Sequence, residues 1–502
     1  MKMLEYTFQH LSGFGSTKEK ELWNRKIYTW SDLEKSYKQQ LNFAFDDHIS
    51  LLSESKNKLS DGDVTYFTTR LPNSLHFLIP HSFPEDTIFL DIETTGLSVY
   101  YDKINIVGWS RLDEYDVFIQ GDYLSEQKLI QSIASAKTII TFNGSMFDLP
   151  FLRKYFENIS VPQCHIDLRF FSKRLGYQGG QKKIEQQLGF QRPDNLLDVD
   201  GYAATILWYK YKEGDLESLK QLIQYNAFDI EGMKFIFEEL TLQLIEKEGL
   251  PIKPTHIYNF SNHNSQFHFT SDPDSEGIFI SHFSGDKGPS CTIGSLKSVV
   301  HEKIVGIDLT GSEKRATGWA LIENKHAVTK TIFTDEELIS ETIKHNPAVI
   351  SIDSPLSIPI GRTSFFDDDP FREEFGITRE CERIMAKRGI KSYPCLIPTM
   401  QMLTQRGMKL ASKFRELGYT VIESYPGAAQ DIMGIPRKGK SLEFLTKGLN
   451  QFGILGEYAH SNVSHDEIDA ITSAIVGYFY MANQFEALGN ESEGYLIVPK
   501  IS

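Results

Sequence analysis

Two acidic residues, Asp91 and Glu93, stand one residue apart in the stretch 89–98, at the end of an apolar run. Side chains alternate along a β-strand, so both carboxylates are expected on the same face. Like charges this close repel by about 4 kcal/mol at an effective dielectric constant of about 20. A hard divalent cation relieves that repulsion, because it takes carboxylate oxygens as ligands. The spacing alone also fits a solvated strand end.

A cation site needs more carboxylates than one strand supplies, and the chain has candidates downstream. Residues 137–151 predict a short apolar strand, an Asn-Gly turn and then Asp148, at the start of the next element. Residues 216–240 have helical periodicity, and Tyr225 and Asp229 are four apart on that helix, so they share a face. In isolation this pair is typical of any helix surface. The order of the whole set along the chain is more specific.

That order is Asp-x-Glu, Asn-Gly-x-x-Phe-Asp and Tyr-x-x-x-Asp. It resembles the DEDD exonuclease superfamily of RNase H-like folds, in the subgroup with Tyr in its third motif (DEDDy). The stretches 165–168 and 179–189 are similar to a predicted bacterial exonuclease group related to YprB, and the resemblance covers roughly residues 1–243. It implies 3′–5′ exonuclease activity with two Mg²⁺ or Mn²⁺ ions held by Asp91, Glu93, Asp148 and Asp229, and an attacking water oriented by Tyr225.

The residue types suit phosphodiester hydrolysis. Charge develops on both the attacking and the leaving oxygen, and two cations roughly 3.5–4 Å apart can stabilise both. Carboxylates prefer hard cations, and no His or Cys cluster in the sequence offers softer ligands. A phenol with an ordinary pKa of about 10 is a weak base at neutral pH. Tyr225 is therefore expected to position a water, whereas His165 and Asp167 are expected to stiffen the surroundings or to end a strand.

The second half of the chain also has acidic residues at predicted strand ends. Asp308 ends the first apolar run of the stretch 304–321. Asp353 ends the strand predicted in 348–355, and Glu423 likewise ends the strand predicted in 419–426. A strand end is a common place for an acid, so each of the three alone also fits an ordinary solvated position.

Residues 464–480 predict a helix. Ser464 and Glu467 match a capping box, and the helix has an apolar stripe with Asp466 and Asp469 three apart on another face. Strand-end acids followed by this helix resemble the RNase H-like core of Holliday-junction resolvases. Residues 303–500 also resemble an uncharacterised family of predicted RNase H-like nucleases, through 387–394, 423–427 and 493–499. The resemblance implies catalytic roles for Asp308, Asp353, Glu423, Asp466 and Asp469, with Asp308, Asp466 and Asp469 as ligands of Mg²⁺ or Mn²⁺.

Other interpretations of the second half stay open. Asp308-Leu-Thr-Gly can be the first phosphate turn of an actin-like or sugar-kinase ATPase, although Asp353 is followed by Ser-Pro-Leu-Ser without the glycines of a second phosphate turn. A copy without catalytic activity could instead serve as a scaffold or substrate-holding partner. For the whole chain, the principal alternative to a nuclease is a non-enzymatic nucleic-acid-binding or assembly protein.

The composition of the chain restricts which partners it can bind. The net charge of −15 argues against broad electrostatic binding of duplex DNA, although cations in the acidic sites would neutralise part of it. An enzyme that grips a single-stranded DNA or RNA end fits better, and nothing in the sequence names a protein partner. No apolar run has membrane-spanning length and the first residues lack the apolar region of a signal peptide. The four cysteines show no disulfide or metal spacing, which indicates reduced thiols and a cytoplasmic location.

A length of 502 residues predicts two or three domains. We expect an α/β protein with two RNase H-like domains, each a mixed β-sheet flanked by helices, and a small N-terminal helical element. The expected boundaries are a helical region at 1–80, with a possible helix-hairpin-helix-like turn at Gly13-x-Gly15, an exonuclease domain at 85–243, a linker at 244–302, and a predicted nuclease domain at 303–502.

Overall fold

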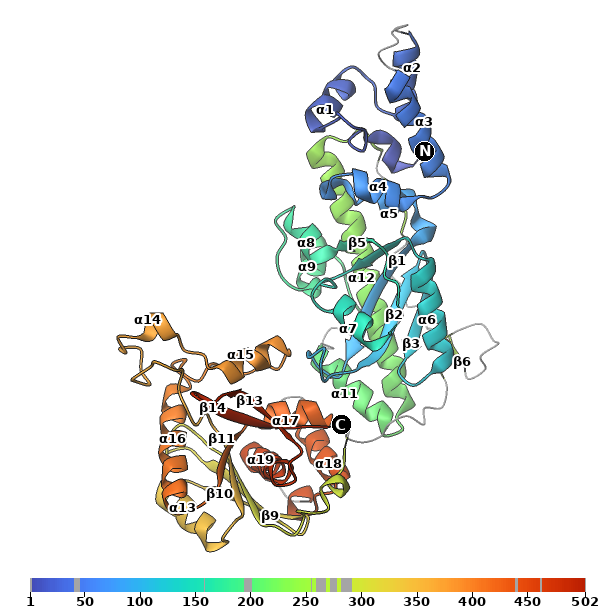
Figure 1. Ribbon diagram of the computed structural model, residues 1–502. Coiled ribbons are helices and arrows are strands. Elements are labelled where there is room, and N and C mark those ends of the chain that lie inside the picture. The colour runs from blue at the N-terminus through green and yellow to red at the C-terminus, as the bar shows by residue number, and fades with distance from the viewer. Residues whose placement is uncertain are drawn as a thin grey trace. The chain divides into compact units, whose positions relative to one another are not determined.

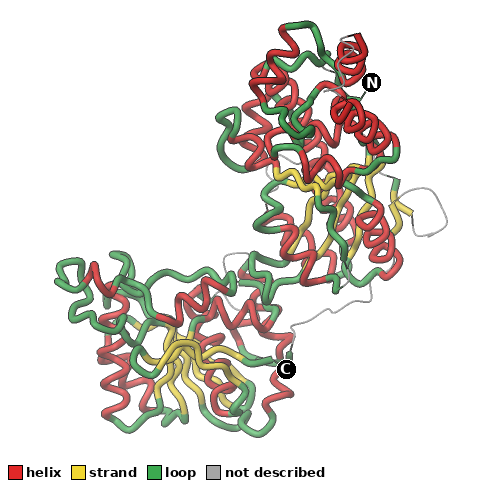
Figure 2. Tube along the Cα trace, turned by 45° about the horizontal axis from the view of Figure 1, so that its top comes forward, coloured by secondary structure: helices red, strands yellow, loops and turns green. Residues whose placement is uncertain are grey.

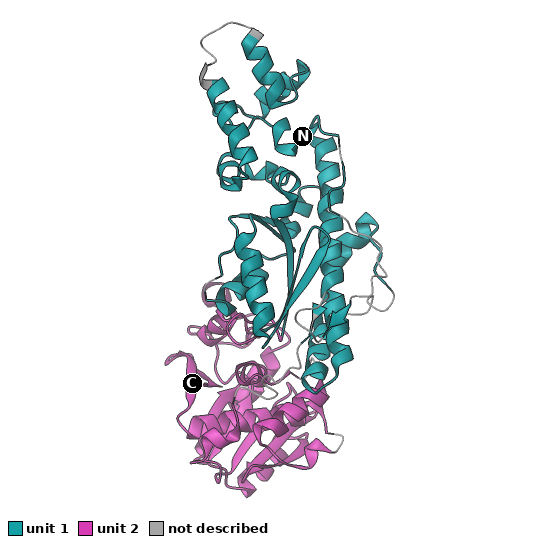
Figure 3. Cartoon of the chain, turned by 90° about the vertical axis from the view of Figure 1, so that its right-hand side faces the viewer, with its two compact units in different colours: residues 1–94, 104–285 teal, residues 95–103, 286–502 magenta. Residues whose placement is uncertain are grey.

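The structure of the protein is a computed structural model that describes residues 2–39, 46–157, 159–193, 201–253, 255–258, 268–270, 278–280, 291–437, 441–460 and 463–501. The chain forms two compact units (Figure 3). The first comprises Met1–Thr94 and Ile104–Gly285, and the second comprises Thr95–Lys103 and Asp286–Ser502. The four cysteines are free thiols. Among the described helices, none is long and apolar enough to cross a membrane.

The first unit begins with short helices. They are α1 (Ser16–Asn24), α2 (Trp30–Gln39), α3 (Asp46–Ser60), α4 (Val64–Arg70) and α5 (Leu78–Ser82). The fully buried side chains of Trp30 and Phe67 belong to the same hydrophobic cluster as Phe237 of the later helix α12 (Leu216–Glu248). The N-terminal helices therefore share a core with the sheet domain that follows them.

The sheet of the first unit has the strand order β3-β2-β1-β4-β5. Its strands are β1 (Thr87–Thr94), β2 (Ile104–Arg111), β3 (Glu114–Ile119), β4 (Thr138–Thr141) and β5 (Cys164–Asp167). Strands β1, β4 and β5 are parallel, whereas β2 is antiparallel to both β1 and β3. The central strand β1 is apolar and almost wholly buried, as expected for a strand covered on both faces.

Helices pack on this sheet (Figure 1). They are α6 (Tyr123–Ser135), α7 (Asp148–Tyr155), α8 (Leu168–Lys173), α9 (Gln181–Leu188), α11 (Gly201–Lys212) and α12 (Leu216–Glu248). Helix α12 packs across β1 and β2. It begins after Asp215, whose carboxylate accepts hydrogen bonds from the backbone N–H groups of Glu217 and Ser218, and it ends at Gly249 in the left-handed conformation. The helix predicted from residue 216 is confirmed, and it continues past residue 243.

The sheet of the second unit has the order β10-β9-β8-β11-β12-β14-β13. Its strands are β8 (Ile304–Asp308), β9 (Thr317–Glu323), β10 (His326–Ile332), β11 (Val349–Asp353), β12 (Val421–Ser424), β13 (Phe485–Asn490) and β14 (Gly494–Pro499). Helices flank it, as Figure 2 shows. They are α13 (Asp335–Lys344), α14 (Arg372–Phe375), α15 (Glu380–Lys387), α16 (Gln401–Glu416), α17 (Pro426–Met433), α18 (Leu442–Phe452) and α19 (His465–Met481).

Helix α19 lies directly against β8 and β9 because glycines face it. A Cβ atom at Gly306 would lie 1.9 Å from the carbonyl oxygen of Ala470, and one at Gly318 would lie 2.1 Å from that of Asp466. The predicted capping box is present, with the Ser464 hydroxyl accepting from the backbone N–H of Glu467. The helix therefore starts where the sequence predicted.

The two sheets share one pattern. The order β3-β2-β1-β4-β5 is repeated as β10-β9-β8-β11-β12, with the first two pairings antiparallel and the next two parallel in each sheet. Both units are thus α/β domains of the RNase H-like kind, each with a mixed sheet flanked by helices, which confirms the predicted fold class. Much of the expected linker at 244–302 lies outside the described residues; β6 (Phe269–Thr270) and β7 (Ile278–Phe279) form a short parallel pair within it.

Candidate metal centre

Three acidic side chains converge in the first unit. Asp91 and Glu93 come from β1 and Asp229 from α12, and one carboxylate oxygen of each lies within 4.8 Å of the other two. Glu93 and Asp229 are buried and Asp91 is half-buried. Across the part of the chain that the structure describes, no other group of three or more His, Cys, Asp or Glu side chains comes this close together.

Asp148, the fourth predicted ligand, lies beside this group. It is the first residue of α7 and its side chain is buried. Its carboxylate accepts a hydrogen bond from the backbone N–H of Ile92, between the two acids of β1. Its charge also acts on Asp91 and Glu93. The structure therefore brings all four predicted acids to one place, with Asp148 outside the tightest group of three.

The electrostatics of the site favour a cation. Burial, followed by the neighbouring carboxylate of Asp229, raises the pKa values of Asp91 and Glu93 well above their usual range. Burial also raises the pKa of Asp148 from 3.8 to about 7. These carboxyl groups therefore retain protons where ordinary ones would ionise. A bound divalent cation would compete with those protons, because it stabilises the carboxylate forms.

Tyr225 borders the acids. It lies one turn before Asp229 on α12 and is buried. Burial, then the charges of Asp229, Glu93 and Asp91, raises its pKa above the ordinary value, so the phenol stays protonated at neutral pH. The ammonium group of Lys182 lies 4.9 Å from the centre of its ring. A neutral phenol can donate a hydrogen bond to water or accept one from it, and the role of Tyr225 in positioning a water stays a prediction.

Asn226 is a residue of the site that the sequence reasoning missed. Its Nδ2 donates a hydrogen bond to Oδ2 of Asp91 at 2.8 Å, and its Oδ1 accepts one from the hydroxyl of Tyr115 at 3.0 Å. Gly108, opposite Asp91 on β2, makes room for it, because a Cβ atom there would lie 1.7 Å from Oδ1 of Asn226. The available signal was its position three residues before Asp229 on a predicted helix face.

Arg192 was missed as well. Its Nη2 lies 2.5 Å from Oδ1 of Asp229, and its Nε and Nη2 each donate to the carboxylate of Glu185 at 2.7 Å. Gln181 donates to the backbone carbonyl of Asp229 at 2.6 Å and to Glu185 at 2.8 Å. The stretch 179–185, which carried part of the family resemblance, thus supports Asp229 from outside the cluster of acids.

Asp167 supports Asp148 indirectly. It is the last residue of β5, and its carboxylate accepts from the backbone N–H groups of Asn143, Ser145 and Arg169. These bonds fix the turn that precedes Asp148. His165 forms a hydrogen bond of 2.9 Å with Thr141 on the neighbouring strand β4. Both residues therefore do what the sequence suggested, stiffening the surroundings of the acids.

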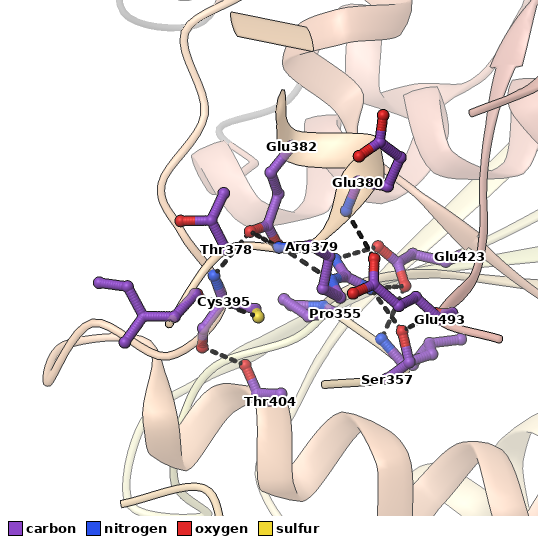
Figure 4. Close-up of polar contacts among 12 residues, drawn as sticks. Pro355, Ser357, Thr378, Arg379, Glu380, Glu382, Cys395, Thr404, Glu423 and Glu493 are labelled. Atoms are coloured by element: carbon purple, nitrogen blue, oxygen red, sulfur yellow. Dashed lines mark hydrogen bonds and ion pairs between the residues drawn. The ribbon is translucent and has the colours of Figure 1, made fainter. Parts of the chain in front are cut away.

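The predicted acids of the second unit divide into three environments. Asp308 and Asp353 are paired residues at the ends of the parallel strands β8 and β11, and both line a pocket. Arg379 forms a bidentate ion pair with Glu423, in which Nη2 donates to Oε1 at 2.7 Å and Nη1 donates to Oε2 at 2.8 Å (Figure 4). Asp469 is buried and accepts from Nε2 of Gln430 at 2.8 Å, and Asp466 lies in the first turn of α19. The catalytic roles of these five residues stay predictions.

Comparison with known proteins supports the first unit's fold. The family profile of the RNase H superfamily matches residues 88–241, which therefore form an RNase H superfamily domain. No curated protein matches the sequence.

Several solved structures are similar to parts of the chain. NrnC of Brucella melitensis is 24% identical, over 34% of this chain and 79% of that one, with a TM-score of 0.25. RNase D of Escherichia coli, an exoribonuclease involved in structured RNA processing, is 18% identical. The match covers 32% of this chain and 45% of RNase D, with a TM-score of 0.19. The family B DNA polymerase of Pyrobaculum calidifontis is 11% identical. The match covers 83% of this chain and 53% of the polymerase, with a TM-score of 0.25.

Proposed function

We propose that the first unit is a metal-dependent nuclease that removes nucleotides from the 3′ end of a DNA or RNA strand. The observation that carries the proposal is the convergence of Asp91, Glu93 and Asp229 within 4.8 Å in an RNase H superfamily domain. Buried like charges are costly unless a cation or a proton balances them. A fold that gathers them beside Asp148 and Tyr225 is suited to holding cations at a reaction site.

The donor set fits Mg²⁺ or Mn²⁺. All four predicted ligands, Asp91, Glu93, Asp148 and Asp229, offer carboxylate oxygens, which hard cations prefer. When bound, two such cations would stabilise charge on the attacking and leaving oxygens of the scissile phosphate.

The other residues of the site keep these groups in place. Asn226 orients the carboxylate of Asp91 by its hydrogen bond to Oδ2, and Arg192 fixes Asp229 through Oδ1. Tyr225, whose phenol is kept neutral because burial and the neighbouring carboxylates raise its pKa, would orient a water beside the acids. Removing any of these contacts would loosen a ligand or the water while leaving the ligands' own chemistry intact.

The finer parts of the proposal rest on the sequence resemblance. The three ordered motifs resemble DEDDy exonucleases, and this supports 3′–5′ polarity, placement in the group related to YprB, and an exonuclease domain at 85–243. For the region 303–502 we propose a second RNase H-like domain with an endonuclease-like or scaffold role. Its paired strand-end acids Asp308 and Asp353 support that assignment.

The experiment is a strand-degradation assay. Single-stranded DNA and RNA labelled at the 5′ or the 3′ end are incubated with Mg²⁺ or Mn²⁺ and the wild-type protein, Asp91→Asn, Asp308→Asn or Asp113→Asn. Asp113 is an exposed acid in the same unit and provides a chemically matched control. We expect stepwise shortening from the 3′ end that Asp91→Asn reduces at least about a hundredfold and that the other two variants retain.

Two outcomes would contradict the proposal. Shortening that Asp91→Asn leaves intact would assign the activity elsewhere, and the absence of any shortening with both cations and both substrates would favour a non-enzymatic binding protein. Internal cuts that require Asp308 would instead assign endonuclease activity to the second unit.

A further inference from the structure

A polar pocket lies at the edge strand β5 of the first unit. Its cavity volume is about 450 Å³, within the range of small-ligand sites. The walls come from β5, from α8 and from the segment 68–77 at the end of α4, and α8 lies beside β5 in Figure 1. The polar side chains that line it include Asn73, His76, Gln163 and Arg174. None of the four acids of the candidate metal centre is among the lining residues, so this pocket is a separate feature of the unit.

Arg174 is a cation that the pocket leaves without a counter-ion. Its guanidinium carbon lies 5.8 Å from the centre of the Phe77 ring and 5.6 Å from that of Phe171, and it is half-buried. Among the described residues no carboxylate forms an ion pair with it, and the charge of Glu248 acts on it only from further away. The two rings offer no oxygen acceptor, so the N–H donors of the guanidinium stay available. An anionic group in the pocket would balance this charge and accept from these donors.

Helix α8 adds further positive charge outside the pocket. The stretch 168–174 contains Arg169, Lys173 and Arg174 and no acid. Arg169 donates to Oδ1 of Asn143 at 2.6 Å, and the ammonium group of Lys173 lies 5.2 Å from the centre of the Phe170 ring. That ring is 48% exposed. In a chain with a net charge of −15, cations gathered around an exposed aromatic ring are the pattern of a nucleic-acid contact.

The pocket lies close to the candidate metal centre. Asp167 lines the pocket, and its charge acts on Asp148. The end of β5 lies two strands from β1 in the order β1-β4-β5, which is about 10 Å at the usual spacing of strands. The carboxylate of Asp167 accepts from three backbone N–H groups, which offset its repulsion of an anionic ligand. A ligand can therefore extend from the acids into the pocket.

We propose that this pocket and the exposed side of α8 hold the body of a single nucleic-acid strand whose 3′ end lies at the acids. Arg174 donates to a backbone phosphate, the Phe170 ring stacks on a base, and Arg169 and Lys173 contact neighbouring phosphates. Stacked nucleotides rise by about 3.4 Å each, so a strand reaches the pocket about three nucleotides from its 3′ end. The protein is thereby suited to polynucleotide strands and gains little from a dinucleotide.

This inference rests on the proposed function of the first unit for the place of the 3′ end. The contacts themselves need neither hydrolysis nor a cation. They can be measured in EDTA, where the acids of the metal centre hold no ion and no strand is shortened. A failure of the binding test is therefore distinct from a failure of the degradation assay.

The test measures fluorescence anisotropy with the full wild-type chain in EDTA over a series of KCl concentrations. The probes are dodecamers and dimers of thymidylate and of uridylate, labelled at the 5′ end with fluorescein. We expect each dodecamer to bind at least about tenfold more tightly than the dimer of the same sugar, because only the dodecamer reaches the pocket. Both sugars are used because phosphate and base contacts are common to DNA and RNA.

Variants locate the contact. Arg174→Gln should weaken dodecamer binding at least about fivefold and reduce the slope of log affinity against log salt by about 0.7, the value for one phosphate contact to a single strand. A purely structural effect would leave that slope unchanged. Phe170→Ala should weaken binding at least about fivefold through lost stacking and keep the slope. Because the Phe170 ring is half-exposed, its removal should leave the fold intact.

Lys128→Gln is the matched control. Lys128 is an exposed cation of α6 that pairs with Asp116 of β3, at the opposite edge of the same sheet. It should change neither the affinity nor the slope. Equal affinities for dodecamer and dimer, or a dodecamer affinity and salt slope that Arg174→Gln leaves unchanged, would overturn the proposal; neither result bears on strand shortening by the acids.

Discussion

Single contacts at the acidic cluster decide how its charge is balanced. Arg192 forms an ion pair with Asp229 of the cluster, and its side chain is only 5% exposed. Its guanidinium also lowers the pKa values of Asp91 and Glu93 against the larger effect of burial. The positive charge of Arg192 thus stabilises the charged form of these carboxylates, as a bound cation would also do.

Replacing Arg192 tests this balance. Breaking a buried ion pair by removing one partner costs about 3 kcal/mol or more, because the other charge stays buried. We expect Arg192→Gln to lower the free energy of unfolding by about 3 kcal/mol in EDTA, measured by urea denaturation. Mn²⁺ should recover part of that loss, since a cation also neutralises Asp229. Arg25→Gln, which changes an exposed arginine of the same unit, should cost less than about 0.5 kcal/mol; equal losses in the two variants would contradict the argument.

The titration of Asp148 gives a pH dependence. Its folded-state pKa, about 7, lies above the ordinary value of 3.8. Between these values the folded protein keeps a proton that the unfolded chain has lost. The metal-free protein should therefore lose stability as pH rises from about 4 to 7, by at most about 1.4 kcal/mol per pH unit for this one group.

Urea denaturation of Asp148→Asn in EDTA at several pH values measures that contribution. The variant cannot titrate at this position, so its stability should fall less steeply with pH than that of the wild type. Asp91 and Glu93 keep some slope in both proteins, because their pKa values are raised too. Identical slopes in the two proteins would show that Asp148 ionises normally in the folded state.

At the scale of elements, close helix packing holds the site together. Helix α9 approaches α12 at Gly232, where a Cβ atom would lie 1.9 Å from Oε1 of Glu185. That oxygen accepts hydrogen bonds from Arg192 and Gln181 and is buried, so it cannot simply rotate away. The missing side chain of Gly232 thus leaves room for the contacts that fix Asp229.

Gly232→Ala should therefore lower the stability of the protein, although helix propensity alone would favour alanine. In a helix interior, alanine is more favourable than glycine by about 1 kcal/mol. Here we expect a loss of about 1 to 3 kcal/mol from overpacking, and weaker Mn²⁺ binding as Arg192 and Asp229 shift. Gly201→Ala in α11 has open space around the new methyl group and should be neutral or stabilising. A stabilised Gly232→Ala protein with unchanged Mn²⁺ affinity would refute the packing argument.

Local signals explain which elements the sequence could predict. The Ser464 and Glu467 capping box marked the start of α19, and apolar runs that end in Asp308 and Asp353 marked β8 and β11. Each of these signals lies within a few residues of the element that it defines. The four acids of the first unit were predictable because their order along the chain resembles a known family.

Contacts between distant segments could not be predicted in the same way. Asn226 reaches Asp91 across 135 residues, and Arg192 reaches Asp229 across 37. Neither partner has a local pattern that reveals the other. The position of Ser424 beside Asp353 is likewise set by packing, because it depends on the register between β11 and β12, and its hydroxyl has no hydrogen-bond partner among the described residues.

At the scale of the molecule, the two sheets have the same strand order but carry different arrangements of acidic residues. In both sheets the central strand of the pattern carries one of the acids, Asp91 on β1 and Asp308 on β8. The helix that packs against this central strand, α12 or α19, comes later in the chain than the strand at the end of the pattern, β5 or β12. In the first unit three carboxylates converge, whereas in the second unit Asp308 and Asp353 line a pocket whose other lining residues are largely apolar. Repetition of the fold thus does not imply repetition of the site.

Each unit has its own hydrophobic clusters, so metal should stabilise them separately. Phe237 and Trp208 belong to clusters of the first unit, and Tyr478 and Phe414 belong to clusters of the second. We expect the calorimetric endotherm in EDTA to contain two components. Saturating Mn²⁺ should raise the midpoint of the component that belongs to the first unit by several degrees, because ligand binding to the folded state stabilises it. Asp91→Asn should abolish the shift of that component, whereas Asp113→Asn should keep it. If the same component still shifts in Asp91→Asn, manganese stabilises the first unit through other ligands, and the convergence of acids on β1 and α12 lacks the function assigned to it.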